Sequence, residues 1–305
     1  MRRAAALLVL AAALSGCGLG AGRTAKNVDL VVSEDFGARP LVQTDAPKRG
    51  GSDTVMRLLQ RNAKVATRYG GGFVQSIDGR AGGRHDGRPV DWFFYVNGIE
   101  SERGAASVKV HDGDHVWWDR HDWGATMRVP AVVGAFPEPF VHGADGKRFP
   151  VRIECGDPHG ADCDRVNDAL LKLGLIPGRG QLGATPSLET LRVLVGTWRQ
   201  VRVNEAAAQL ARGPRASGVY AKPSADGRTI AALDARGHVR ERLGAGTGLV
   251  AATSTNDQQP TWVVTGTDAA GVSAAVAAFA QGESTLAGKF ALAISGGRGI
   301  ALPAR

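Results

Sequence analysis

Short apolar stretches separated by glycine-rich turns recur along the first half of the chain. One of them, from Val55, has helical spacing and follows Ser52-Asp53-Thr54, where a serine or aspartate cap is expected to start a short helix. The others are continuous or alternating and rich in β-branched and aromatic residues, which is typical of strands. These strand patterns lie at 28–32, 73–77, 91–96, 107–110 and 115–119. One helix with a small mixed sheet predicts an N-terminal β-grasp (ubiquitin-like) domain over 28–130.

The pattern changes near residue 130, after which helical stretches alternate with strands. The helical stretches lie at 164–173, 204–212 and 269–280. The strand patterns lie at 151–154, 191–195, 217–220, 229–234, 239–243, 248–252, 261–265 and 290–294. This alternation predicts a second, unassigned domain over 131–305, an α/β or α+β sandwich with helices packed on a sheet. The chain as a whole is therefore expected to be an α+β protein of two domains.

The beginning of the chain has the pattern of a targeting signal. Two arginines precede an apolar run over 4–14, which is shorter than the roughly 20 residues that span a bilayer. The next residues, Leu14-Ser15-Gly16-Cys17, resemble the bacterial lipobox. The resemblance implies a signal peptide over 1–16, lipidation of Cys17 and a tether over 17–27. We therefore expect an extracytoplasmic protein that is lipid-anchored to the bacterial cell membrane; the alternative is an ordinary secretory signal.

The composition and charge of the chain exclude some classes of protein and some kinds of binding partner. The 305 residues are 43% hydrophobic and 22% charged, which excludes disordered and fibrous proteins. The formal charge is +8, but the arginines are scattered rather than gathered in a stripe, so a nucleic-acid partner is not expected. The charge favours contact with anionic lipid or cell-wall polymers, and an arginine-rich proteome is an equally good explanation.

The cysteines support the same compartment. If Cys17 is lipidated, Cys155 and Cys163 remain as an even pair in an oxidising environment. They are separated by a short loop that contains Gly156, Asp157 and Pro158, so we predict a disulfide between them. The alternative is a metal site with the nearby histidine at 159, but that arrangement lacks a standard zinc spacing.

Four segments of the first half carry a family resemblance. They are Asp53-Thr-Val-Met-Arg-Leu-Leu, Gly72-Phe-Val-Gln-Ser-Ile-Asp-Gly, Trp92-Phe-Phe-Tyr-Val-Asn-Gly and Asp112-Gly-Asp-His-Val-Trp. In this order, across about 28–123, they resemble the transcobalamin-like C-terminal domain family, of the DUF4430 type, which also occurs in bacterial surface lipoproteins. The resemblance implies a β-grasp domain that, in the vitamin B12 carriers, closes over one face of the corrinoid. The resemblance therefore implies a cobalamin-like ligand. We expect no resident cofactor.

The chain also departs from the carriers, which complete the corrinoid site with an α/α barrel. No helix-pair repeat in this sequence predicts such a barrel. Either a partner supplies it in trans, or the ligand differs, or the domain docks another protein. The expected partners are thus the membrane, a corrinoid, and a separate α/α-barrel protein or an uptake permease.

Aromatic residues are the candidate ligand-binding set: Trp92, Tyr95, Trp117, Trp118 and Trp123. Trp117 and Trp118 are neighbours on one expected strand, so their side chains point to opposite faces. We expect one of them in the core and the other at the surface, where the exposed aromatic cluster would stack on a flat ligand, a sugar or a partner. The alternative is that all five pack in the core or at an edge.

The run from 111 to 122 is rich in histidine and aspartate, which transition metals accept as ligands. Strand alternation divides these residues between two faces and leaves His115, Asp119 and His121 as one three-ligand set. We favour a turn followed by a polar face, and therefore no metal site. A second alternative is that His115 or His121 offers an axial nitrogen to a corrinoid cobalt.

Motifs of catalysis are missing from the sequence, which contains no Gly-x-Ser-x-Gly, His-Glu-x-x-His or plausible Cys/His nucleophile pair. The glycine-rich stretches at 244–248 and 264–271 lack the context of a phosphate-binding loop. We therefore expect a non-catalytic binding protein that captures a corrinoid or another large ligand for membrane uptake. The alternative is a cell-surface adhesion or scaffold lipoprotein whose β-grasp domain docks a partner protein.

Overall fold

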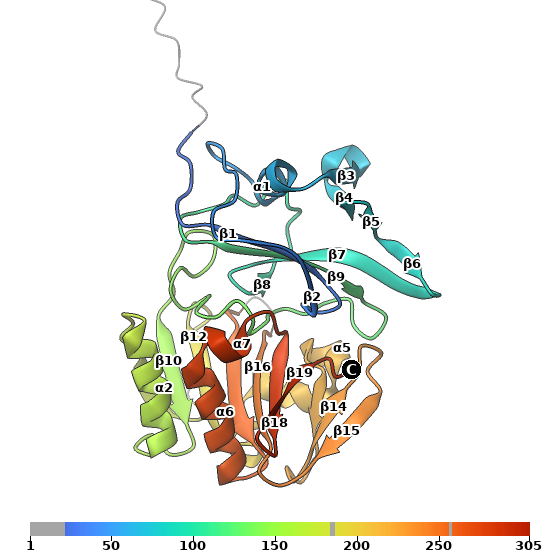
Figure 1. Cartoon of the computed structure of the whole chain (residues 1–305). Helices are drawn as coiled ribbons and strands as arrows, with labels where there is room; N and C mark the ends of the chain where they lie inside the picture. The colour runs from blue at the N-terminus through green and yellow to red at the C-terminus, as the bar shows by residue number, and fades with distance from the viewer. Residues whose placement is uncertain (1–21, 184–186, 256–257) are drawn as a thin grey trace, which may run out of the picture.

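The computed structural model describes residues 22–183, 187–255 and 258–305. The architecture is mixed α+β, as the sequence predicts, and consists of two sheet-containing parts that pack against each other (Figure 1). The signal peptide predicted over 1–16 and the predicted lipidation site Cys17 lie outside the described residues. Within the described part of the chain, no helix is long and apolar enough to cross a membrane.

The N-terminal part is built on a six-stranded sheet in the order β2-β1-β9-β7-β6, with β8 paired to β7. Its strands are β1 (Asp29–Glu34), β2 (Arg39–Thr44), β6 (Gly83–His85), β7 (Arg88–Val96), β8 (Ile99–Glu100) and β9 (His115–Asp122). β1 and β9 run parallel, whereas the other pairs are antiparallel. The first and last strands of this part therefore lie side by side within the sheet.

Helix α1 (Val55–Asn62) covers one face of this sheet (Figure 1). Its apolar side chains, among them Leu58 and Leu59, are buried in a core shared with β1, β7 and β9. The helix start is found where the sequence predicts it, but the cap is Thr54 rather than a serine or aspartate: the Thr54 hydroxyl accepts a 3.3 Å hydrogen bond from the Arg57 amide. The chain then forms a small antiparallel sheet of β3 (Val65–Arg68), β4 (Phe73–Ile77) and β5 (Arg80–Ala81), with a 3-10 turn, η1 (Tyr69–Gly71), between the first two.

The C-terminal part is built on a seven-stranded sheet in the order β11-β10-β12-β17-β16-β18-β19. Its strands are β10 (Val151–Cys155), β11 (Gly178–Gln181), β12 (Leu191–Thr197), β16 (Gly248–Thr253), β17 (Thr261–Gly266), β18 (Ala291–Ser295) and β19 (Arg298–Leu302). The strands from β11 to β17 are parallel, and those from β17 to β19 are antiparallel. Helices α2 (Ala161–Lys172) and α6 (Ala269–Gln281) pack together on one face and enclose an apolar core.

Short elements cover the other face of this sheet. They are α3 (Trp198–Val201), α4 (Glu205–Ala208), η2 (Gln209–Arg212), α5 (Pro214–Ser217), β13 (Ala221–Pro223), β14 (Ile230–Leu233) and β15 (Val239–Leu243), while α7 (Glu283–Leu286) follows α6. The helix predicted over 204–212 is therefore interrupted at Gln209, where it tightens to a 3-10 turn. The strand predicted at 217–220 is wrong, because Gly218 adopts a left-handed conformation directly after α5. The strand predicted at 107–110 is reduced to one bridge between Thr54 and Lys109.

Phe290, the residue before β18, joins the two parts. Its ring lies edge-on to Phe36, Tyr95, Trp117 and His121, with centroid distances between 5.2 and 5.5 Å. All four partners belong to the N-terminal part, so the face of its sheet opposite α1 packs against the C-terminal part. Such edge-to-face contacts add to the free energy of burying the rings.

Candidate functional site

The aromatic residues predicted to bind a ligand do not form an exposed cluster. Trp92, Tyr95, Trp117 and Trp118 are buried, and Trp123 is half-buried. Trp117 and Trp118 do point to opposite faces of β9, as strand alternation requires. Trp118 lies in the core beneath α1, and Trp117 packs against the C-terminal part. The expectation that one of them lies at the surface is therefore wrong, because the second face is covered by the chain itself.

A buried carboxylate, Asp119, organises this covered face. It accepts hydrogen bonds from the Phe36 and Gly37 amides (3.0 and 2.8 Å) and from the Ser33 hydroxyl (2.5 Å). His121 lies 2.8 Å away through Nδ1, and its ring is packed between two aromatic rings. The network satisfies a charge that would otherwise be costly to bury, and it fixes the turn between β1 and β2.

His115 lies apart from this pair. Its Nδ1 is 3.7 Å from the carboxylate of Asp29 on the neighbouring strand. The three-residue set of His115, Asp119 and His121 is therefore not brought together as a ligand sphere. Across 22–183, 187–255 and 258–305, no group of three or more His, Cys, Asp or Glu side chains is placed to hold a metal ion.

A cleft of about 870 Å³, which we call the main cleft, lies beside the covered face. One wall comes from β1, β2 and β9 of the N-terminal part and includes Asp29, Gln43 and His115. The facing residues come from the connection over 134–142 and from the α7 region, with Glu283 at the start of that helix. Both parts of the chain thus contribute to one cavity.

The main cleft is acidic, although the chain as a whole is basic. Asp29, Asp45, Glu138 and Glu283 line it, whereas none of the described lysines or arginines does. In the described part of the chain, none of these four carboxylates forms a salt bridge with lysine or arginine; Asp29 and Glu138 face histidines instead. Phe136 adds aromatic surface to the lining, and Trp117, which is almost fully buried, lies in the wall behind it. This combination suits an organic cation, which carboxylates and aromatic faces both attract.

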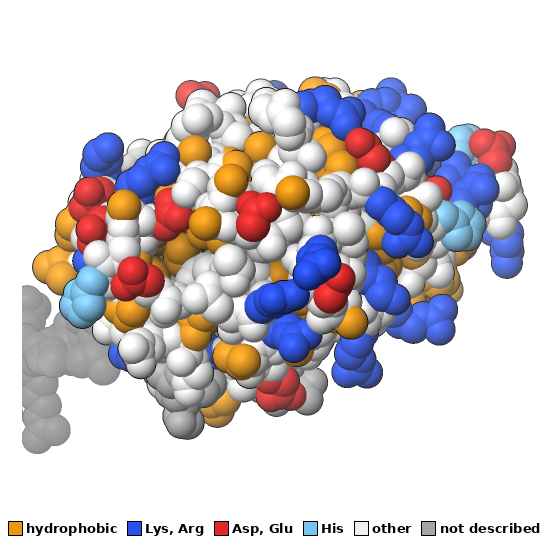
Figure 2. All heavy atoms as spheres, turned by 90° about the horizontal axis from the view of Figure 1, so that it is seen from below, with side chains coloured by type: hydrophobic (Ala, Val, Ile, Leu, Met, Phe, Trp, Pro, Cys, Tyr) orange, Lys and Arg blue, Asp and Glu red, His pale blue; other side chains and the backbone are white. Residues whose placement is uncertain are grey.

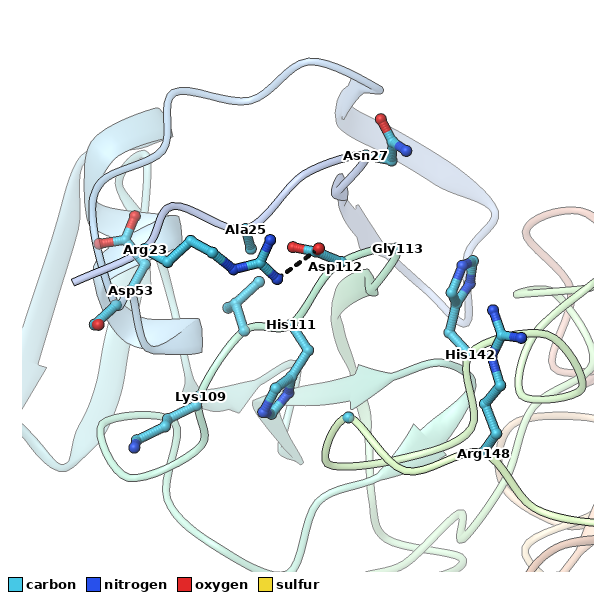
Figure 3. A pocket seen from close by; sticks show the side chains of 13 residues that line it. Arg23, Ala25, Asn27, Asp53, Lys109, His111, Asp112, Gly113, His142 and Arg148 are labelled. Carbon is cyan, nitrogen blue, oxygen red and sulfur yellow. Dashed lines mark hydrogen bonds and ion pairs between the residues drawn. The ribbon is translucent and has the colours of Figure 1, made fainter.

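His142 lines both the main cleft and a side hollow of about 460 Å³ (Figure 3). Its Nδ1 is hydrogen-bonded to the buried carboxylate of Glu138, which also accepts a 2.9 Å hydrogen bond from the His142 amide. These contacts hold the imidazole with its Nε2 edge over Gly113. A Cβ at Gly113, which has a φ of +80°, would lie 2.3 Å from that nitrogen, so the ring position depends on glycine here.

The side hollow is lined by charges of both signs. Figure 3 shows Arg23 reaching Asp112, at a distance of 2.6 Å, with Lys109 and Arg148 elsewhere on the wall. Hydrogen bonds from the Lys26 amide and from Arg23 lower the pKa of Asp112. The side hollow therefore combines cations and carboxylates, whereas the main cleft is lined by carboxylates without any described lysine or arginine.

Cys155 and Cys163 form the predicted disulfide. Cys155 is the last residue of β10, and Cys163 lies in the first turn of α2. The bond therefore ties the end of a strand to the start of the next helix. The prediction from the cysteine count is confirmed.

The fold and the cleft define a two-part α+β protein. A family model described as a domain of unknown function (DUF4430) matches residues 52–122. No curated protein matches the chain. Solved structures that match include a protein from Ruminococcus gnavus ATCC 29149 described as a "putative metal binding protein", which is 15% identical and has a TM-score of 0.25; the match covers 32% of this chain and 97% of that chain. A likeness this distant carries no argument about the present chain.

Sequence reasoning did not identify Asp29, Glu138, His142 or Glu283 as site residues. They come from separate segments that only the folded chain brings to one cavity. One local signal was available, because Glu138 and His142 are four residues apart, a spacing at which side chains meet in a helical turn. That signal lies in a proline-rich connection and is weak without the structure.

Proposed function

We propose that the protein is an extracytoplasmic, lipid-anchored binding protein that holds a small organic cation in the main cleft. The observation that carries this proposal is a group of carboxylates in one cleft of a chain whose formal charge is +8; among the described residues, none of them pairs with a lysine or arginine. Carboxylates that gather in one concave site attract a cation together, although Asp45 and Glu283 are exposed. A ligand with two or more amino groups fits this chemistry best.

The placement of the carboxylates indicates how such a ligand would lie. Asp29 belongs to β1, and Glu283 begins α7, so a molecule with two cationic groups can contact both parts of the chain. Phe136 offers aromatic surface to the carbon chain between those groups. The bound ligand would therefore stabilise the contact between the two parts as well as fill the cleft.

A corrinoid is the ligand that the β-grasp resemblance implies. In this chain, however, Tyr95 and Trp117 pack on Phe290, so the aromatic face that would meet a planar ligand is already occupied. We therefore place the ligand beside that face, in the main cleft, and include cobalamin as a comparison in the test.

The proposed location, outside the cytoplasm and anchored to the membrane by lipid, rests on the sequence. The short apolar run over 4–14 and the Leu14-Ser15-Gly16-Cys17 motif support export and lipidation at Cys17. Two acyl chains or more give stable attachment to a membrane, whereas one chain gives only marginal binding. An anchored binding protein keeps its ligand near a membrane uptake system, which is the partner we propose.

Isothermal titration calorimetry tests the ligand part of the proposal. The sample is residues 18–305, which contain every described residue, at low ionic strength. We expect saturable binding of spermidine with a Kd on the order of 10–100 μM, a free energy of about −5 to −7 kcal/mol. Asp29→Asn and Glu283→Gln should each weaken binding about threefold to tenfold, because each removes one carboxylate from the cleft.

Asp86→Asn is the matched control, since Asp86 is exposed in the turn between β6 and β7 and does not line the main cleft. It should bind spermidine as the unmodified protein does. Binding that survives both cleft substitutions unchanged would contradict the proposal. So would saturable binding of cobalamin in the absence of any binding of spermidine.

A further inference from the structure

A second cavity, the arginine pocket, has the opposite charge from the main cleft. It has a volume of about 440 Å³ and lies where β1 ends and β2 begins, next to β5, β6 and β9. Its charged and titratable lining residues are Glu34, Arg39, Arg80, Arg84, His85 and Arg120. Seen from below, lysine and arginine side chains gather towards the end of the molecule at which β6 lies (Figure 2).

Glu34 holds the arginines in place. This carboxylate is buried, and its oxygens lie 3.1 Å from both Arg80 and Arg120 and 3.9 Å from Arg39. Arg120 is fixed at a second point, because its Nε donates a 2.7 Å hydrogen bond to the Ala81 carbonyl. A ligand would therefore meet guanidinium groups that are already ordered, which lowers the entropic cost of binding.

Arg84 completes the pocket from another strand. Its guanidinium donates a 2.8 Å hydrogen bond to the Gly87 carbonyl within the β6–β7 turn, and among the described residues it has no carboxylate partner. The pocket thus contains four guanidinium groups and one carboxylate, a surplus of three positive charges. Since each guanidinium has five N–H donors and Glu34 has two oxygens, most of the donors remain free for a ligand.

From this arrangement we propose that the arginine pocket binds a phosphate group. A phosphate carries up to two negative charges and offers several strong acceptor oxygens, so it can take paired hydrogen bonds from two or more guanidiniums at once. A ligand with a single carboxylate would neutralise less of the surplus positive charge than a phosphate would. The pocket already contains one carboxylate, that of Glu34, which pairs with Arg80 and Arg120. The phosphate can belong to a lipid headgroup or to a free anion.

Two binding measurements on residues 18–305 distinguish these sources. The first is calorimetric titration with inorganic pyrophosphate, and the second is co-sedimentation with phosphatidylglycerol vesicles, with phosphatidylcholine vesicles as a blank. The variant is the double substitution Arg39→Gln with Arg84→Gln, which leaves the contacts of Arg80 and Arg120 with Glu34 intact. We expect this variant to lose at least tenfold in affinity for the phosphate ligand, and the affinity of the unmodified protein to fall with added salt.

Arg212→Gln serves as the control for a lost surface charge, because Arg212 is exposed in η2 and lies outside the pocket. Circular dichroism and the thermal midpoint establish that each variant is folded. A loss confined to the vesicle arm assigns the phosphate to a lipid headgroup, and a loss confined to pyrophosphate assigns it to a free anion. The inference is overturned if neither ligand binds, or if Arg212→Gln weakens binding as much as the double variant does.

Discussion

At the scale of the residue, burial of the Glu100 carboxyl makes its pKa depend on the fold. Glu100 is the last residue of β8. Its buried Oε2 has no hydrogen-bond partner among the described residues, and Nε of Arg128 lies 3.8 Å from that oxygen. Burial raises the pKa of this carboxyl from 4.5 to about 7, and Arg128 opposes the shift only in part. Because the folded state holds the proton more tightly than the unfolded chain does, Glu100 makes stability fall as the pH rises from about 4.5 to about 7.

Glu100→Gln removes this dependence, since the amide stays neutral at every pH. We expect the variant to exceed the unmodified protein in free energy of unfolding by about 3 kcal/mol at pH 8, and to match it near pH 4.5. Urea denaturation at the two pH values measures the difference. Glu102→Gln is the control, because the exposed Glu102 pairs with the same arginine; equal pH profiles for the two variants would show that burial of Glu100 has no effect.

At the scale of the element, the disulfide between β10 and α2 closes a short loop. Replacing both Cys155 and Cys163 by alanine should lower the free energy of unfolding by about 2–3 kcal/mol, because the unfolded chain then regains the freedom of that loop. Chemical denaturation of the unreduced proteins measures this loss. Thiol titration of unfolded, unreduced residues 18–305 should find no free thiol, and two titratable thiols would contradict the bond.

The elements that could be predicted from the sequence are those with a strong pattern of their own. The capped amphipathic stretch of α1, the aromatic strand β7 and the apolar strand β17 were all expected near their observed positions. β2 and β11 could not be found in this way, because they are edge strands with many exposed or glycine positions. Their pairing depends on a neighbouring strand that the local sequence does not reveal.

The candidate site was harder to predict than the elements. Alternation correctly placed Trp117 and Trp118 on opposite faces, but no pattern in the sequence indicates that the C-terminal part covers the face of Trp117. The main cleft depends on the same contact, since it forms at the border of that covered face. The sequence pattern assigns single residues to a face of a strand. It does not identify which residues meet across the cleft.

At the scale of the whole molecule, Phe290 should make the two parts unfold together. Phe290→Ala removes a buried ring that contacts four aromatic side chains, so we expect a loss of about 3–5 kcal/mol. Differential scanning calorimetry should show one transition for the unmodified protein and two for this variant. Phe279→Ala, at a buried position of α6 within the C-terminal part, should lower the stability without separating the transitions. Two transitions in the unmodified protein would contradict the coupling.

The central claim is that both parts of the chain hold one ligand in the main cleft. Hydrogen exchange of residues 18–305, measured with and without spermidine, tests this claim directly. Because the cleft is lined from both sides, we predict slower exchange in 29–45 of the N-terminal part and also in 134–142 and 283–288. Protection confined to one part, or no protection at saturating spermidine, would contradict the account.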